Sequence, residues 1–150
     1  MGLAHLVGFL GRHDEVALDT SVFVYQAEAR VKYVRLTQEI FAWLEKPGHR
    51  GVTSTITMTE LLVKPYRDGD VPQVKNCFAL FSRYPNLDWV APNLQISDQA
   101  ARLRAEFGLK TPDAIEAATA IYCGISGFLT NDLAYQRVSK LDTLVLDDVL

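Results

Sequence analysis

Short apolar segments alternate with longer amphipathic segments along this 150-residue chain. The apolar segments are three or four residues long and rich in branched side chains, at residues 16–18, 52–54, 87–90, 128–130 and 144–146. Between them, apolar residues recur at helical spacing over residues 31–45, 56–63, 70–84, 97–107 and 113–123. Short buried strands that alternate with helices are typical of parallel sheets. The pattern therefore predicts a layered α/β fold with a largely parallel sheet.

The chain length favours one domain, which we expect over residues 16–150 after an extension of residues 1–15. A chain of this size buries enough surface to fold without a disulfide or a structural metal. The extension is either a short amphipathic helix or a flexible segment, because its apolar residues have helical spacing. They are Leu3, Leu6, Val7 and Leu10.

The sequence shows no sign of a membrane segment or of export. No apolar run reaches the roughly 18 residues that a membrane-spanning helix needs. The extension lacks the basic start of a signal peptide. The two cysteines, Cys77 and Cys123, have no metal-binding spacing and fit reduced, buried thiols. We therefore expect a cytoplasmic protein.

The charge balance limits the ways in which the chain can meet nucleic acid. It has 15 basic and 18 acidic residues, for a net charge of −3. A protein that coats DNA without sequence preference is usually basic, so this class is disfavoured. An enzyme that approaches nucleic acid through bound cations stays compatible with the charge, because the ions change the local sign of the field.

Four acidic residues follow the predicted strands. Asp19 follows the first strand and Asp132 the fourth, Asp113 opens the helix before the fourth strand, and Glu60 lies on the helix after the second. Ligands of parallel sheets bind beyond the carboxyl ends of the strands, where these acids would converge. Clustered carboxylates repel each other unless a cation lies among them. Mg²⁺ or Mn²⁺ is the natural partner of such an all-oxygen site.

Each acid also has a purely structural interpretation. Asp19 could turn the chain by accepting a hydrogen bond from the backbone of Ser21. Glu60 could close a capping box with Thr57 or pair with Lys64 one turn later. Asp113 fits the first turn of a helix, where the dipole favours an acid, and Asp132 could cap a helix around residues 133–137. The functional interpretation rests on the convergence of all four.

Proline and capping residues predict where some of the helices begin and end. Pro65 should end the helix of residues 56–63. Ser97 should be the N-cap of the helix that runs to about Phe107, and Thr111 the N-cap of the helix that contains Asp113.

Beyond these patterns, the sequence resembles PIN-domain ribonucleases of the VapC toxin type over about residues 16–148. Four segments carry the resemblance. Residues 18–21 contain Asp19-Thr20-Ser21, and residues 55–61 contain Glu60. Residues 109–120 contain Thr111-Pro112-Asp113-Ala114, and residues 128–132 contain Thr130-Asn131-Asp132. The resemblance implies a three-layer α/β/α fold around a central, mostly parallel sheet of about five short strands. It also implies a metal-dependent endoribonuclease that hydrolyses phosphodiester bonds of single-stranded RNA with Mg²⁺ or Mn²⁺.

The resemblance assigns roles residue by residue. The catalytic acids map to Asp19, Glu60, Asp113 and Asp132. Asp19, Asp113 and Asp132 would bind the metal, and Glu60 would complete its shell or orient the attacking water. The polar residues that support them map to Thr20, Ser21, Thr130 and Asn131. The family further implies a cognate antitoxin and a homodimer, for which the apolar seam of residues 70–84 is a candidate interface.

Further charged residues surround the four acids. Glu116, one turn after Asp113, either adds a supporting carboxylate or is simply solvated. Basic side chains flank the acids and could hold RNA phosphates, or they could be ordinary exposed charges. They are Lys64, Arg67, Lys110 and Arg137.

Rival functions make different demands on the sequence. A non-catalytic PIN-like RNA-binding or scaffold protein is the alternative within the same fold, and a missing acid would favour it; none is missing. A receiver-like phospho-acceptor needs paired acids early in the chain and an aspartate after a middle strand, and the third strand contains Asp88-Trp89-Val90, which fits poorly. A dehalogenase-type phosphatase needs two aspartates one residue apart, where this chain has Asp19-Thr20-Ser21.

Overall fold

The computed structural model describes residues 2–150, and its centre is a five-stranded sheet in which every neighbouring pair is parallel. The strand order is β3-β2-β1-β4-β5, so β1 lies in the middle. This confirms the predicted α/β fold with five short strands. The strands are β1 (Glu15–Leu18), β2 (Arg50–Ser54), β3 (Leu87–Val90), β4 (Gly127–Thr130) and β5 (Asp142–Val145).

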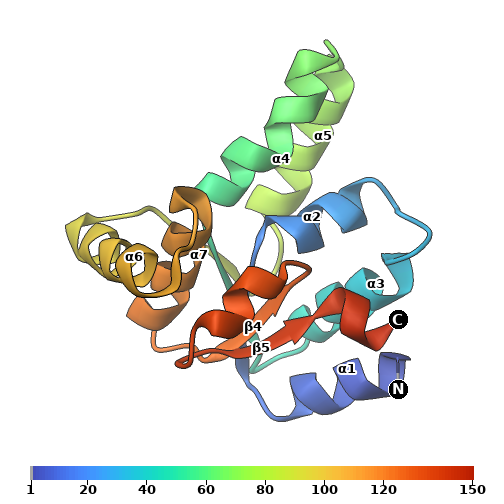
Figure 1. Cartoon of the computed structure of the whole chain (residues 1–150). Helices are drawn as coiled ribbons and strands as arrows, with labels where there is room; N and C mark the ends of the chain where they lie inside the picture. Colours follow the sequence, from blue (N-terminus) through green and yellow to red (C-terminus); the bar gives the residue numbers. More distant parts are fainter. Residues whose placement is uncertain (1) are drawn as a thin grey trace.

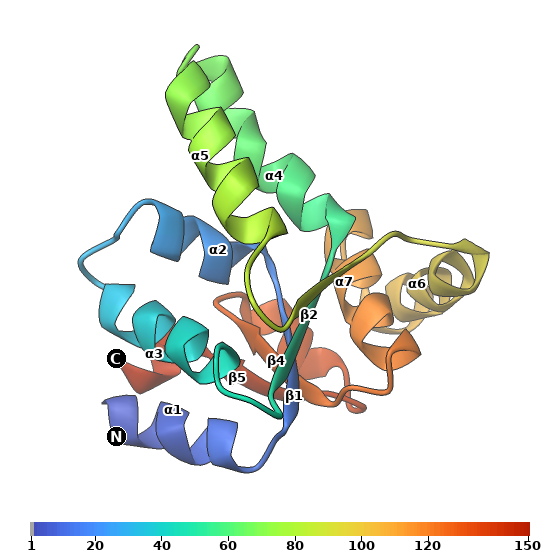
Figure 2. The same cartoon turned by 180° about the vertical axis from the view of Figure 1, so that it is seen from behind.

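Helices cover both faces of the sheet, as the three-layer expectation requires (Figure 1). One face carries α1 (Gly2–Gly11), α2 (Thr20–Ala27) and α3 (Val34–Leu44), and the other carries α6 (Leu94–Phe107) and α7 (Thr111–Tyr122). The pair α4 (Thr55–Arg67) and α5 (Val71–Ser82) projects from the body as an arm (Figure 2). Short 3-10 helices follow β4 and β5, namely η1 (Leu133–Arg137) and η2 (Leu146–Val149).

The hydrophobic core is divided by the sheet into two clusters. Alternate side chains of β1 point to opposite faces, with Val16 and Leu18 in the cluster under α1–α3 and Ala17 in the cluster under α6 and α7. The four buried alanines of α7 are small, so this helix packs close to the sheet and to α6. They are Ala114, Ala117, Ala118 and Ala120. This close packing holds the first turn of α7 against the ends of the central strands.

The N-terminal extension contains helix α1, one of its two predicted alternatives. Leu6, Phe9 and Leu10 are buried, whereas Val7 is 48% exposed. The buried side chains belong to the same cluster as those of α3 and η2, which α1 contacts. The helix therefore completes one layer of the domain. Among residues 2–150, no helix is long and apolar enough to pass through a lipid bilayer.

Several predicted helix boundaries were wrong. α4 continues through Pro65 to Arg67, because a proline in the last turn removes only its own bond to the carbonyl four residues earlier, and the Pro65 ring is buried. α6 begins at Leu94, and the side chain of Asn93 caps it by accepting from the amide of Ile96, which leaves Ser97 inside the helix. α2 was not predicted, since its short sequence shows little amphipathic pattern, and α3 begins at Val34 rather than at residue 31.

The N-cap of α7 is Lys110 rather than Thr111. The hydroxyl of Thr111 instead accepts a 2.9 Å hydrogen bond from Arg104, whose Nε–H also donates to the carbonyl of Leu109. α7 thus begins without a side-chain cap, because the residue expected to cap it is turned toward α6.

Candidate functional site

Asp19 lies at the centre of the candidate site, directly after the middle strand β1. One carboxylate oxygen, Oδ1, accepts from the amide (3.0 Å) and the hydroxyl (2.5 Å) of Ser21, and Oδ2 accepts from the hydroxyl of Thr130 (2.5 Å). The backbone bond confirms the turn interpretation, and Asp19 is also the N-cap of α2. Burial raises the pKa of Asp19 to about 6, although these hydrogen bonds oppose the shift. Asp19 is 6% exposed, and three hydrogen bonds fix the orientation of its carboxylate.

Asp132 joins this site from the neighbouring strand. β1 and β4 pair in parallel, so the residues after each strand meet at one edge. The amide of Asp132 donates to the hydroxyl of Thr130, and the amide of Asn131 donates to the hydroxyl of Ser21, both at 3.0 Å. The Asp132 side chain is exposed and accepts from the amide of Ala134, which confirms that it caps η1.

Asn131 holds the end of β4, next to Asp132, against neighbouring elements of the fold. Its amide nitrogen donates to the hydroxyls of Tyr25 and Tyr33, whose rings are stacked 4.0 Å apart. Its side-chain oxygen accepts a 2.8 Å bond from the amide of Asp147. The side chain therefore ties the end of β4 to α2, to the residues before α3 and to η2.

Glu60 reaches the site from the arm. Its Oε1 accepts a 2.6 Å hydrogen bond from the hydroxyl of Thr20, next to Asp19. The capping box with Thr57 is absent, because Ser54 caps α4 by accepting from the amide of Ile56. Glu60 is exposed, so its carboxylate faces solvent at the base of α4.

Asp113 enters from the first turn of α7, as the helix-dipole interpretation predicts. It is half-buried, and the buried hydroxyl of Tyr135 donates to its Oδ1 at 3.2 Å. Burial raises the pKa of Asp113, and the negative charges of Asp132 and Glu60 raise it further, while Lys110 opposes them. The negative charges of Glu60 and Asp132 thus act on Asp113, and that of Asp113 acts on Asp19. We call these four residues the acid cluster: Asp19, Glu60, Asp113 and Asp132.

Glu116 is buried, so the interpretation of it as a solvated residue was wrong. Its Oε1 accepts from the amide of Ser54 at 3.1 Å, and its Oε2 lies 2.6 Å from the hydroxyl of Thr57. Burial raises the pKa of Glu116 well above its ordinary value, and the negative charge of Asp19 adds to the shift. Glu116 therefore lies behind the acid cluster and connects α7 with the junction of β2 and α4.

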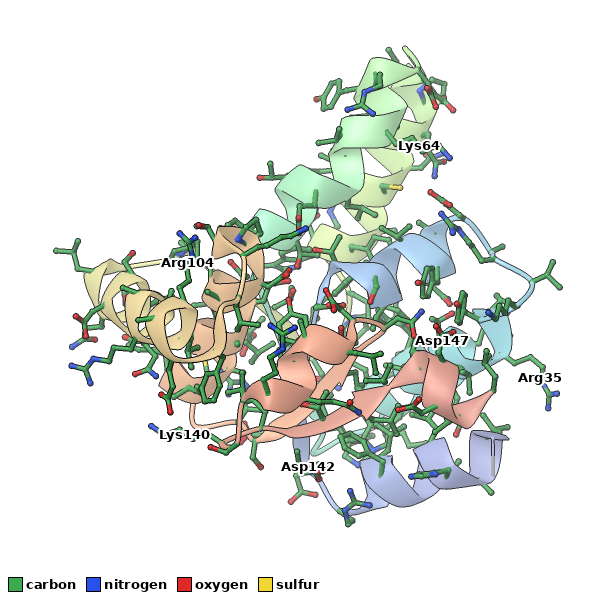
Figure 3. The ribbon with its side chains drawn as sticks, viewed as in Figure 1. Arg35, Lys64, Arg104, Lys140, Asp142 and Asp147 are labelled. Carbon is green, nitrogen blue, oxygen red and sulfur yellow. The ribbon has the colours of Figure 1, made fainter. Side chains whose placement is uncertain are left out.

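The four candidate RNA-binding residues occupy different places. Lys110 lies beside Asp113 at the start of α7 and is exposed. Arg137 donates to the carbonyl of Phe107 at 3.1 Å. Lys64 and Arg67 lie in the last turn of α4, on the arm, where Figure 3 labels Lys64. Of the four, Lys110 lies nearest to the acids in the sequence, and its positive charge lowers the pKa of Asp113.

The acid cluster has the oxygen donors that a divalent cation requires. Among residues 2–150, none of its members forms a salt bridge, and Lys110 is a basic side chain that acts on one of them, Asp113. In the same residues, no three acidic, histidine or cysteine side chains are already arranged around one point as metal ligands. The donors are nonetheless all carboxylate oxygens, which suit Mg²⁺ and Mn²⁺. The set fits such an ion by its chemistry, and Glu60 and Asp132 are its two exposed members.

Three residues beside the site were not predicted from the sequence to support its acids. Thr53 and Thr57 are buried hydroxyls 2.7 Å apart, and Tyr135 belongs to the core beneath α7 while its hydroxyl reaches Asp113. A threonine at the end of a buried strand is a weak signal, because threonine is common in strands for packing reasons alone. Only the fold shows that the hydroxyls of Thr57 and Tyr135 reach carboxylates, and that Thr53 bonds to Thr57 and to the carbonyl of Leu18.

A parallel sheet with four carboxyl groups near the carboxyl ends of its central strands defines an α/β protein with an acidic site. Comparison with protein families agrees with this description, because the PIN domain family matches residues 16–141. The chain belongs to the PIN domain family. A search of curated proteins returned no match.

Solved structures with the same fold include toxins bound to their antitoxins. VapBC2 from Rickettsia felis, bound to a promoter DNA fragment, is 17% identical over 87% of this chain and 98% of that chain, with a TM-score of 0.67. A toxin–antitoxin complex from Klebsiella pneumoniae is 21% identical over 87% and 97%, with a TM-score of 0.67. VapC20 from Mycobacterium tuberculosis, which cleaves the sarcin–ricin loop, is 17% identical over 75% and 86%, with a TM-score of 0.59. At these identities the likeness establishes the fold alone.

Proposed function

We propose that this protein is a metal-dependent endoribonuclease that hydrolyses phosphodiester bonds of single-stranded RNA, and that it is the toxin of a toxin–antitoxin pair. One observation carries the proposal. Four acids from segments far apart in the sequence lie where the central strands end, and none of them forms a salt bridge among residues 2–150. Such a surplus of negative charge is unfavourable for folding alone but suits a cation-dependent enzyme.

The acid cluster would hold Mg²⁺ or Mn²⁺ through Asp19, Asp113 and Asp132. Such an ion, when bound, activates water and stabilises the leaving oxygen of a phosphodiester. Within the chain, Ser21 and Thr130 fix the orientation of Asp19 through its three accepted hydrogen bonds. Tyr135 does the same for Asp113.

Glu60 has the geometry of a base or orienting group. Its carboxylate is exposed, and Thr20 fixes one of its oxygens. It can accept a proton from the attacking water while that water approaches the phosphorus. Attack by water rather than by the 2′-hydroxyl leaves a 5′-phosphate and a 3′-hydroxyl. Lys110, beside Asp113, is the residue best placed to contact a phosphate of the RNA.

The arm supplies a surface for the proposed antitoxin. A groove of about 850 Å³ between α4, α5 and β3 is lined mainly by apolar side chains and begins at Thr55, directly after the junction that contacts Glu116. The groove includes Met58, Leu62, Val63, Tyr66, Phe78 and Trp89. We propose that an apolar segment of the antitoxin occupies this groove and approaches the acid cluster from it.

The apolar seam of residues 70–84 is only partly available to a partner. Val74 and Phe81 are buried within the protein, whereas Val71 and Phe78 are more than half exposed. The seam therefore has an inner part that belongs to the fold and an outer part that a second protein could cover. The homodimer stays a prediction, and light scattering of wild type and Phe78→Glu will show whether a second copy occupies this surface.

The proposed activity is tested with purified protein and a fluorescently labelled single-stranded RNA at neutral pH. We expect the protein to work in the cytoplasm. We expect cleavage with Mg²⁺ or Mn²⁺, none in EDTA, and a loss of at least about 100-fold for Asp113→Asn. Glu106→Gln, an exposed change on α6, is the matched control and should cleave like wild type. The non-catalytic alternative predicts RNA binding without cleavage under all of these conditions.

A further inference from the structure

A chain of short hydrogen bonds runs behind the acid cluster from Glu116 to the backbone before Asp19. Glu116 Oε2 lies 2.6 Å from the Thr57 hydroxyl, and that hydroxyl lies 2.7 Å from the Thr53 hydroxyl. The Thr53 hydroxyl lies 2.9 Å from the carbonyl oxygen of Leu18. This series of hydrogen bonds therefore links α7, α4, β2 and β1 within the interior of the protein.

The number of protons available to this series of hydrogen bonds depends on the charge of Glu116. A carbonyl oxygen only accepts, so the Thr53 proton must point to Leu18. If Glu116 were ionised, the Thr57 proton would have to point to Glu116. The two threonine oxygens would then face each other at 2.7 Å with no proton between them. Such a contact is repulsive and would not be kept at hydrogen-bond length.

A protonated Glu116 satisfies every contact. Its proton is donated to Thr57, Thr57 donates to Thr53, and Thr53 donates to the carbonyl of Leu18. The second oxygen of Glu116 still accepts from the amide of Ser54. Thr20 does not disturb this order, because its proton goes to Glu60 at 2.6 Å and its contact with Thr57 is 3.4 Å long.

We propose that Glu116 is a positioning residue, neutral in the free protein, whose directed chain of hydroxyls fixes the spacing between the elements that carry Asp113, Glu60 and Asp19. This inference rests on the proposed function only for its effect on cleavage. A neutral Glu116 also keeps a fifth negative charge out of the acid cluster.

The surroundings of Glu116 favour the neutral form. The negative charges of Asp19, at the end of β1, and of Glu60, on α4, raise the pKa of Glu116, and Tyr135 of η1 is a further titratable neighbour. The bonds to Thr57 and to the amide of Ser54 act in the opposite direction. No charged base pairs with Glu116 among residues 2–150. Burial also raises the pKa of Glu116.

The protonation state is measured by infrared spectroscopy of the full-length protein at pH 7.5, without any substrate. We expect the carbonyl band of a protonated carboxylic acid in wild type, its persistence in Asp19→Asn and its loss in Glu116→Gln. Absence of the band in wild type, its loss in Asp19→Asn or its survival in Glu116→Gln would each overturn the proposal. This measurement does not depend on nuclease activity, so it stays decisive if no RNA is cleaved.

The positioning role is measured by cleavage and thermal unfolding of variants. Glutamine reproduces the hydrogen bonds of a neutral glutamate, because its amide donates to Thr57 and its oxygen accepts from Ser54. We expect Glu116→Gln to keep cleavage within about threefold of wild type, whereas Glu116→Leu and Thr57→Val each lose about 10-fold or more. Thr57→Val keeps the test valid if the leucine variant does not fold. Equal activity in all three variants, or loss in the glutamine variant, would refute the positioning role.

Discussion

The hydroxyl of Tyr135 donates a 3.2 Å hydrogen bond to Oδ1 of Asp113, so the segment after β4 orients an acid on α7. Tyr135 is buried, and burial raises its pKa above the physiological range, so it stays a donor. Tyr135→Phe removes only this hydroxyl. We expect cleavage to fall about 10-fold, as for other residues that orient a metal ligand. Unchanged cleavage with unchanged folding would show that this bond has no role in activity.

Asp19→Asn tests the buried acid directly. The neutral side chain keeps the acceptor for Ser21 but loses an acceptor for Thr130. We expect a loss of cleavage of at least about 100-fold together with a melting temperature equal to or above that of wild type at pH 7.5, because a buried charge is removed. Parallel cleavage and calorimetric measurements test both parts, and a fully active variant would contradict the site.

The pH dependence of stability follows from the same residue. The pKa of Asp19 is about 6 in the folded protein against an ordinary value of 3.8, so the folded state holds its proton more tightly than the unfolded state. Its contribution to stability is therefore greatest below pH 3.8 and is lost as pH rises toward 6, by about 3 kcal/mol in total. Asp142 and Asp147 have lowered pKa values and act in the opposite direction.

The difference between wild type and Asp19→Asn isolates this contribution. Urea unfolding from pH 4 to pH 7 should show the asparagine variant gaining stability relative to wild type as pH rises. A difference that does not change with pH, or that changes with the opposite sign, would contradict the shift assigned to Asp19.

The packing of α1 gives a prediction that concerns stability alone. Leu6 is fully buried and Val7 is 48% exposed, although they are neighbours on the same helix. We expect Leu6→Ala to lower the free energy of unfolding by about 2–5 kcal/mol and Val7→Ala to change it by less than about 0.5 kcal/mol. Equal effects in chemical denaturation would show that α1 does not pack on the domain in solution.

Much of the fold followed from the sequence because its signals are local. Runs such as Val16-Ala17-Leu18 are too short and apolar for anything but buried strands in a parallel sheet. The errors arose where long-range contacts override local preference. Thr111 did not cap α7 because Arg104 binds its hydroxyl, and Pro65 did not end α4 because it is buried within the arm.

The candidate site was predictable in its acids but not in their support. Asp19 and Asp132 follow strands, and the ends of neighbouring parallel strands must meet, so their convergence follows from topology. The role of Glu116 could not be read in the same way, because its spacing from Asp113 is equally typical of a solvated helix face. Only the packing of α7 against β2 shows that its carboxyl group is enclosed.

Titration calorimetry with Mn²⁺ tests most directly whether the acid cluster holds a divalent cation. We expect the wild-type protein to bind Mn²⁺, Asp113→Asn to bind it at least about 10-fold more weakly, and the control Glu106→Gln to bind it as wild type does. Equal affinity of wild type and Asp113→Asn, or no binding by the folded wild-type protein, would contradict the account.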